Sequence, residues 1–252
     1  MLFDYLIDEP LAYRMRPQHI DDIIGQNHII GKHTALYRMI QKGFVPSMLL
    51  YGVPGIGKTS MAQAIAGTVQ YPFISINATT SGKKDIEEAV EQAKINGKLL
   101  LFIDEIHRFN KLVQDTLLPH VERGLITLIG ATTENPFHEV NPAIRSRCGR
   151  ICQLKPIEPK DIKLLLQRAL TDKDRGLGKE KIHISDECLD LIATSINGDA
   201  RSALTILEES VKASEKNEEH VIVVEKQTIL ECIENKGFTH DKQGDTYYDL
   251  LS

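Results

Sequence analysis

The residues Gly52-Val53-Pro54-Gly55-Ile56-Gly57-Lys58-Thr59 fill every fixed position of the pattern G-x-x-x-x-G-K-[ST]. The apolar run before them, Met48 to Tyr51, predicts a buried strand, and Ser60 to Ala66 after them carry the apolar spacing of a helix. A glycine-rich loop between a strand and a helix points backbone N–H groups at an anion. The stretch therefore predicts an α/β fold with a phosphate-binding loop after a strand of its sheet.

Each residue type in this loop has a physical reason to be there. The glycines allow unusual backbone angles and close approach of a ligand. Lys58 supplies a positive charge for the phosphates, and the Thr59 hydroxyl is a ligand for Mg²⁺. We therefore expect ATP and Mg²⁺ as cofactors. The candidate nucleotide-binding residues of the loop are Gly52, Val53, Pro54, Gly55, Ile56, Gly57, Lys58, Thr59 and Ser60.

A second motif consists of two adjacent carboxylates that follow an apolar run. Leu99 to Ile103 are apolar on both faces, as in a central strand of a parallel sheet, and ligands bind where such strands end. We expect Asp104 to hold Mg²⁺ together with Thr59, and Glu105 to polarise the attacking water. An Asp-Glu pair can also begin a helix. The preceding strand and the phosphate loop favour the catalytic interpretation.

Composition limits the class of protein. The chain has 252 residues, 42% of them hydrophobic, and a net charge of −5. No apolar run approaches the length of a membrane span, and the first residues lack the features of a signal peptide, so we expect a cytoplasmic protein. The four cysteines lack C-x-x-C spacing, which favours reduced core thiols over a zinc site.

The negative net charge means that any contact with DNA must be a local patch of basic residues. Lys83 and Lys84 follow Ser81-Gly82, and Arg108 and Lys111 follow the acidic pair. These four are the candidate DNA contacts. The alternative for each is a solvated loop or helix face, and the sequence leaves both open.

Repeated strand and helix patterns predict a parallel sheet flanked by helices, followed by a helical region. The predicted strands are Met48 to Tyr51, Phe73 to Asn77, Leu99 to Ile103, Ile126 to Thr132 and Arg150 to Leu154. Two prolines in Lys155 to Pro159 predict a hinge. Everything after it has helical periodicity, with Ser185 and Asp199 as N-caps and a fourth helix over Glu225 to Ile233.

We therefore expect an α/β nucleotide-binding domain over residues 1–157 and a small all-helical lid over residues 158–236. Residues 237–252 are polar and then become apolar at Tyr247-Tyr248-Asp249-Leu250-Leu251. We expect this segment to be the start of a truncated C-terminal oligomerisation region.

Three further motifs follow in order: Gly130-Ala131-Thr132-Thr133, Ser146-Arg147-Cys148 and Gly198-Asp199-Ala200-Arg201. With them, residues 10 to 235 resemble the AAA+ ATPases. The resemblance implies that Thr133 senses the attacking water or γ-phosphate, and that Arg147 reaches a neighbouring subunit's site. It also implies that Arg201 contacts the γ-phosphate from the lid. Arg145 stays open as the alternative to Arg147.

Within these ATPases the chain resembles the RarA/MgsA group of replication-associated recombination proteins, related to Werner-helicase-interacting proteins. The resemblance lies in Pro10 to Pro17, Asp22 to Gln26, His107 to Lys111, Gly130 to Pro136 and Asp241 to Asp245. It implies ATP hydrolysis coupled to DNA at stalled forks and ends, in a tetramer near the bacterial nucleoid, with single-stranded-DNA-binding protein as a further partner. Family position alone implies that Arg16, Pro17 and Ile24 line an adenine pocket.

Two kinds of alternative function stay open. Clamp-loader subunits share Ser-Arg-Cys, and the branch-migration motor RuvB shares Asp-Glu-Ile-His and Gly-Ala-Thr-Thr. The chain could instead be an ATP-dependent scaffold whose turnover is incidental. The presence of Glu105, Thr133, Arg147 and Arg201 speaks against an inactive ATPase.

Overall fold

The computed structural model describes residues 9–234. The chain forms two compact units, and each is described by itself. The α/β unit is Arg16–Ile157, and the helical unit combines residues 9–15 with residues 158–234. The chain therefore passes from one unit to the other twice.

A five-stranded parallel sheet forms the centre of the α/β unit, in the order β2-β3-β4-β1-β5. The strands are β1 (Met48–Tyr51), β2 (Phe73–Asn77), β3 (Leu99–Asp104), β4 (Ile126–Thr132) and β5 (Arg150–Gln153). The central strand β3 is buried from Leu99 to Ile103, as its continuous apolar run predicts. The predicted parallel α/β fold is thus confirmed.

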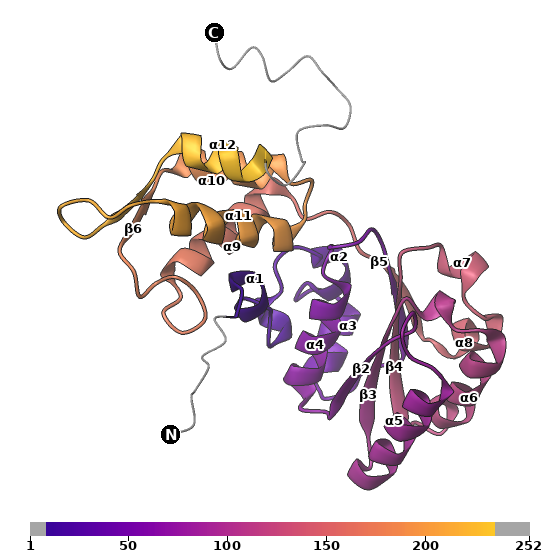
Figure 1. Cartoon of the computed structure of the whole chain (residues 1–252). Helices are drawn as coiled ribbons and strands as arrows, with labels where there is room; N and C mark the ends of the chain where they lie inside the picture. The colour runs from indigo at the N-terminus through magenta and orange to yellow at the C-terminus, as the bar shows by residue number, and fades with distance from the viewer. Residues whose placement is uncertain (1–8, 235–252) are drawn as a thin grey trace, which may run out of the picture. The chain divides into compact units, whose positions relative to one another are not determined.

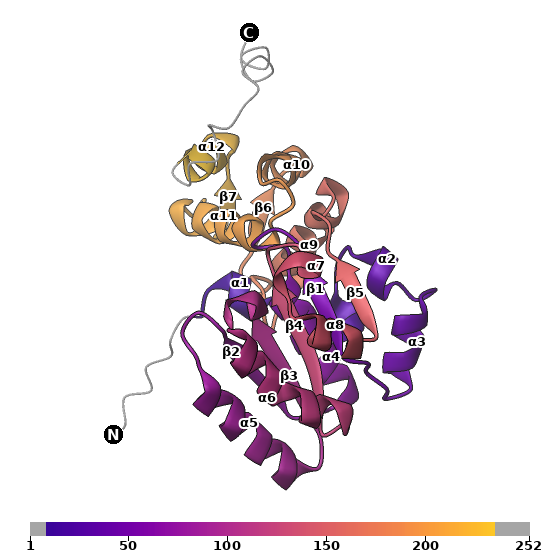
Figure 2. The same ribbon diagram turned by 90° about the vertical axis from the view of Figure 1, so that its right-hand side faces the viewer.

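Helices cover both faces of this sheet (Figures 1 and 2). One face packs on α2 (Asn27–Ile30), α3 (Ala35–Gln41) and α4 (Lys58–Val69), and the other on α5 (Lys83–Asn96), α6 (Lys111–Glu122) and α8 (Pro142–Arg147). Short helices η1 (Ile20–Asp22), η2 (Ile106–Arg108) and α7 (Pro136–Glu139) lie in the connections. Alternate residues of each strand enter opposite cores: Met48 and Leu50 face α4, and Leu49 faces the other layer.

The carboxyl ends of β1, β3 and β4 meet at one edge of the sheet. The backbone N–H of Gly52, just after β1, donates to the carbonyl of Thr132 at the end of β4, at 3.3 Å. The neighbouring β3 ends at Asp104. This edge therefore brings the phosphate loop, the acidic pair and Thr133 to one place, as expected for ligand binding in parallel sheets.

The helical unit contains α1 (Leu11–Arg14), α9 (Pro159–Thr171), α10 (Asp186–Ser195), α11 (Ala200–Ala213) and α12 (Lys226–Glu234). Both predicted N-caps are confirmed. The Ser185 hydroxyl accepts from the N–H of Cys188, and the Asp199 carboxylate accepts from the N–H groups of Arg201 and Ser202. Over the part of the chain that the structure covers, no helix is long and apolar enough to cross a membrane.

The expectation of an all-helical region after residue 158 was wrong in one respect. Two short strands, β6 (Ile182–Ile184) and β7 (Ile222–Val224), form a parallel pair. Each has three residues, too few for alternation to distinguish a strand from a loop or a helix end. Their pairing joins segments 40 residues apart, which a local pattern does not reveal.

The expected domain boundary also needs a correction at the N-terminal side. Residues 1–157 were expected to form one domain, but α1 packs on α11 within the helical unit. Leu11 is fully buried there, and its N–H donates to Glu208 Oε2 at 2.9 Å. Since a four-residue helix depends on tertiary contacts, its own sequence could not place it. The expected C-terminal region, residues 237–252, lies outside the described residues.

Candidate functional site

The phosphate loop is built on three glycines with positive φ angles. Gly52, Gly55 and Gly57 have φ values of 151°, 77° and 96°, a region that favours glycine. Helix α4 begins directly after Gly57, at Lys58 rather than at the predicted Ser60. The unpaired N–H groups of its first turn thus belong to residues of the loop motif, which suits an anion.

Lys58 is held in an unusual environment for an ammonium group. The residue is only 7% exposed, and Nζ donates to the carbonyls of Gly52 and Val53 at 2.7 and 3.1 Å. Burial lowers the pKa of Lys58, although Glu105 and Asp104 oppose that change. A buried cation bonded to neutral carbonyls leaves its charge incompletely balanced. The loop therefore fits a phosphate group, whose oxygens would complete that balance.

Gly52 gives a test of the loop's geometry. A Cβ at Gly52 would lie 2.9 Å from the Leu154 carbonyl oxygen, at a φ of +151° that strains any other residue. We expect Gly52→Ala to destabilise the chain by about 1–3 kcal/mol and to weaken nucleotide binding. Urea unfolding and nucleotide titration would measure both effects.

Gly82→Ala is the matched control for this prediction. Gly82 has an extended φ of −142°, and a Cβ there meets no heavy atom within 4 Å. Because Gly82 is the N-cap of α5, we expect this control to lower stability by no more than about 1 kcal/mol and to leave nucleotide binding unchanged. Equal unfolding midpoints for the two variants would contradict the role given to Gly52.

The acidic pair lies where β3 ends. The Asp104 carbonyl accepts from the N–H of Ala78 at 3.0 Å, and its Oδ1 accepts from the N–H of Glu105 at 3.2 Å. Glu105 itself has a left-handed backbone with φ 51°, which costs free energy in a residue other than glycine. The carboxylate of Asp104 and the hydroxyl of Thr59 are hard oxygen donors that suit Mg²⁺.

Thr133 lies beside Glu105. The N–H and the hydroxyl of Thr133 both donate to Glu105 Oε2, at 3.3 and 3.2 Å. The residue predicted to sense the reaction thus contacts the residue predicted to polarise the water. This contact lies at the carboxyl ends of β3 and β4, which is where neighbouring parallel strands bring such groups together.

His107 is a further member of this cluster. The sequence places it near the acidic pair, but it is not one of the predicted site residues. It lies in η2, its side chain is only 6% exposed, and its Nδ1 is 2.8 Å from Thr132 Oγ1. The same Nδ1 is 3.4 Å from Glu105 Oε2. In the sequence, the feature that points to His107 is its position two residues after Glu105, close to the end of a buried strand. That position is also compatible with an ordinary core histidine.

Helix α8 carries Arg145 and Arg147, and α6 holds it in place. The Asn141 side chain caps α8 by accepting from the N–H of Ala143, and it donates to Asp115 Oδ1 of α6 at 2.7 Å. After α8, burial raises the pKa of the Cys148 thiol to about 12, so Cys148 is an uncharged core residue. All four cysteines are free thiols.

The two arginines of α8 differ in their partners. Arg147 is exposed, and its guanidinium pairs with Glu122 Oε1 of α6 at 2.5 Å. Arg145 is half-buried, lies over the ring of Phe137 at 5.7 Å, and donates to the Phe137 carbonyl. Because an exposed ion pair exchanges easily with another anion, Arg147 is the more available of the two.

The residues proposed for the adenine pocket lie in the N-terminal segment of the α/β unit. Arg16, Pro17 and Ile24 are all half-buried. Nearby, the buried side chain of Gln26 fixes this segment to the end of β5. Its Nε2 donates to the carbonyl of Lys155 at 2.6 Å, and its Oε1 accepts from the N–H of Lys155 at 3.0 Å. Gln26 was not among the predicted site residues.

Arg201 belongs to the helical unit, where it is exposed in the first turn of α11. Among the candidate DNA contacts, Lys83 and Lys84 are exposed and pair with Glu87 and Glu88 at 3.2 and 3.8 Å. Arg108 and Lys111 are also exposed. Since exposed ion pairs contribute little free energy, all four cations remain available to an anionic partner.

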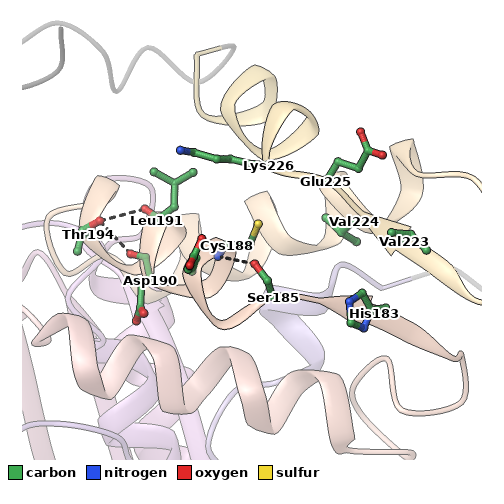
Figure 3. A pocket seen from close by; sticks show the side chains of 11 residues that line it. His183, Ser185, Cys188, Asp190, Leu191, Thr194, Val223, Val224, Glu225 and Lys226 are labelled. Carbon is green, nitrogen blue, oxygen red and sulfur yellow. Dashed lines mark hydrogen bonds between the residues drawn. The ribbon is translucent and has the colours of Figure 1, made fainter. Parts of the chain in front are cut away.

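The helical unit has a separate hollow of about 500 Å³ between α10, α12 and the β6–β7 pair (Figure 3). Its lining includes Ser185 and Cys188 of the α10 start, and Val224, Glu225 and Lys226 opposite them. None of the predicted nucleotide-binding residues lines it. This hollow is therefore distinct from the site on the sheet edge.

Comparison with known proteins agrees with the α/β fold and the phosphate loop described above. Residues 48–156 match the family described as "ATPase family associated with various cellular activities (AAA)", and residues 178–252 match "AAA C-terminal domain". The chain belongs to the AAA ATPase family.

Its relatives in this family include proteins named replication-associated recombination protein A. The one from Bacillus subtilis is 48% identical over 97% of this chain and 58% of its own length. The one from Escherichia coli K12 is 43% identical, over 97% of this chain and 55% of its own length. The expected resemblance to this group is confirmed. The chain spans little more than half the length of these relatives.

Two more distant relatives widen the comparison. ATPase WRNIP1 of Dictyostelium discoideum is 35% identical over 96% of this chain and 30% of its own length. The structure of the Thermotoga maritima RuvB Holliday junction branch migration motor has a TM-score of 0.72 and 26% identity, covering 94% of this chain and 77% of that one. The fold of the chain is therefore shared with a branch migration motor.

Proposed function

We propose that the chain hydrolyses ATP in a Mg²⁺-dependent reaction and couples it to DNA during replication-associated recombination. The observation that carries this proposal is the meeting of Lys58, Asp104 and Glu105 at one edge of the sheet, where both carboxylates act on the Lys58 charge. Phosphate release from ATP tests it, with Lys58→Ala as the control. Absence of release above that control would contradict the proposal.

In the proposed reaction, phosphoryl transfer needs positioning and neutralisation of charge more than covalent chemistry. Backbone N–H groups of the loop and Lys58 bind the phosphates, and Glu105 accepts a hydrogen bond from the attacking water. Mg²⁺, held by Thr59 and Asp104, would neutralise phosphate charge. Thr133 fixes the Glu105 carboxylate through the two contacts described above. Arg16, Pro17 and Ile24 are proposed to contact the adenine.

Arginines complete the proposed site. Arg147 acts on a neighbouring subunit's ATP, and its exposed position on α8 supports this role. Arg201, exposed in the first turn of α11, contacts the γ-phosphate from the helical unit. A homo-oligomer follows from the role of Arg147, and we propose the tetramer that the resemblance implies. We also propose cytoplasmic localisation near the nucleoid.

The proposed DNA substrates are forks, single-stranded gaps and ends, and single-stranded-DNA-binding protein is a proposed partner. The names of the bacterial relatives, which refer to replication and recombination, support this choice. The structural likeness to a branch migration motor supports a second candidate, movement of Holliday junctions. Comparing stimulation of the ATPase by gapped DNA and by four-way junctions would separate them. A clamp-loader role and a scaffold with incidental turnover are further alternatives.

The basic residues give a prediction about DNA. We expect neutralisation of Lys83, Lys84, Arg108 and Lys111 to abolish DNA stimulation of the ATPase and to leave basal hydrolysis intact. Because few cations are involved, log affinity should fall with log salt at a slope no steeper than about −4. Fluorescence anisotropy of labelled gapped DNA would measure that slope.

Neutralising Lys32 and Lys42, which are exposed elsewhere in the α/β unit, is the control for this prediction. The control should respond to DNA as the unaltered chain does. If DNA still stimulates the ATPase of the fourfold variant, these four residues are not the DNA contacts. If the control variant loses DNA stimulation to the same degree, the loss is caused by the change in net charge.

A further inference from the structure

His107 is buried beside Glu105 and makes contacts that the proposed reaction has not yet used. Its Nε2 has no hydrogen-bond partner among the described residues, whereas its Nδ1 lies near two oxygens. A proton on Nε2 would be a buried donor without a partner, at a cost of about 1–3 kcal/mol. Orphaned buried N–H groups are rarer than unsatisfied acceptors. A lone pair on Nδ1 would also face the Glu105 carboxylate oxygen at 3.4 Å, and two acceptors repel each other, so we place the proton on Nδ1.

With the proton on Nδ1, His107 is a donor toward Thr132 and Glu105. Thr132 Oγ1, at 2.8 Å, also accepts from the N–H of Glu134 at 3.0 Å, so its two lone pairs are both used. Glu105 Oε2, at 3.4 Å from Nδ1, is the second oxygen within reach of the same proton. At 3.4 Å this approach is an electrostatic contact rather than a hydrogen bond of normal length.

The donors around Glu105 all approach one oxygen of its carboxylate. The N–H and hydroxyl of Thr133 and the Nδ1 of His107 lie 3.3, 3.2 and 3.4 Å from Oε2. These three contacts come from the residue that follows β4 and from η2. With Oε2 held in this way, Oε1 remains to accept a proton from water.

We propose that His107 is a positioning residue for ATP hydrolysis, which holds the Glu105 carboxylate through Oε2 so that Oε1 orients the attacking water. This inference rests on the proposed function and deepens it. His107 touches neither nucleotide nor water in this scheme. It acts through Glu105, and the positive φ of Glu105 shows that the backbone there is also held in a constrained conformation.

The test compares His107→Leu and His107→Asn in the whole chain. Leu removes the donor and keeps apolar bulk, whereas the Asn amide nitrogen lies close to where Nδ1 was. We expect kcat to fall about 10-fold to 100-fold in His107→Leu, because a misplaced catalytic group costs that much. ATP affinity should stay within about twofold, since Lys58 and the loop bind the phosphates. His107→Asn should keep most of the turnover.

A double variant shows whether His107 acts through Glu105. Because Glu105→Gln already removes the carboxylate, adding His107→Leu should cause no further loss of turnover. A further loss, or a slow His107→Asn, would overturn the inference, as would normal turnover in His107→Leu. If His107→Leu fails to fold, His107→Gln replaces it, because its amide lies near the former Nε2. A turnover in His107→Gln equal to that in His107→Asn would also overturn it.

The outcomes separate this inference from the proposed function. A slow Glu105→Gln with a fast His107→Leu refutes only the role of His107. Normal turnover in Glu105→Gln refutes the role of Glu105 and with it the inference, but leaves ATP hydrolysis standing. No turnover in the unaltered chain refutes the proposed hydrolysis and the inference together.

Discussion

Mixing an Arg147→Ala variant with a Lys58→Ala variant will restore ATPase activity that neither variant shows alone. The first retains an intact phosphate loop and the second retains the arginine, so a mixed oligomer contains complete sites. An arginine that acts on a neighbour's phosphates contributes on the order of 10³ to 10⁵ in rate. Steady-state phosphate release, measured over a series of mixing ratios, would follow the restored activity.

The exposed pair of Arg147 with Glu122 makes this result physically reasonable. The pair holds the guanidinium at the surface, but an exposed ion pair is weak enough to be replaced by a phosphate. Arg145→Ala is the matched control, because Arg145 is half-buried against Phe137. No restored activity in oligomers that demonstrably exchange subunits would contradict the role of Arg147. Restoration only with the Arg145 variant would transfer the role to Arg145.

Glu105→Gln should separate ATP binding from hydrolysis. The amide has nearly the same shape but is a far weaker acceptor for a water proton, so we expect turnover to fall by about 10² to 10⁴. Affinity for ATP should change little, because the loop and Lys58 hold the triphosphate. Titration with a fluorescent nucleotide beside phosphate release would measure both quantities.

Lys58→Ala gives the contrasting result in the same assays. Since its ammonium is buried and bonded to the loop carbonyls, its removal should abolish binding as well as turnover. If Glu105→Gln turns over near the normal rate, Glu105 does not polarise the water. If Lys58→Ala still binds ATP tightly, the loop does not hold the phosphates in the manner proposed.

The sheet could be predicted from the sequence because each strand is a short apolar run between helical segments. Leu99 to Ile103 is the clearest example, since burial on both faces requires an unbroken apolar run. The phosphate loop could be predicted because its geometry needs glycine at fixed positions, which the positive φ angles show. Residues within each of these segments determine its structure, so the sequence of the segment alone is enough to predict it.

The features that the sequence did not predict depend on contacts between distant segments. The strands β6 and β7 are recognisable only as a pair, and α1 only through its place on α11. The sequence places His107 near the acidic pair, but its contacts, like those of Gln26, depend on atoms from distant segments. The Gln26 side chain joins two segments that are far apart in the sequence, around residues 26 and 155. No periodic pattern in the sequence predicts this contact.

The double passage of the chain between its two units has a consequence for how the protein folds. Leu11 bonds to Glu208 across 197 residues of sequence, so α1 leaves the ribosome long before its partner exists. The α/β unit, which is continuous from Arg16 to Ile157, can fold while the rest is still being synthesised. The helical unit can close only after the α/β unit has been made, because α1 packs on α11. A destabilised α11 would therefore expose α1 to proteases, although the two helices are far apart in the sequence.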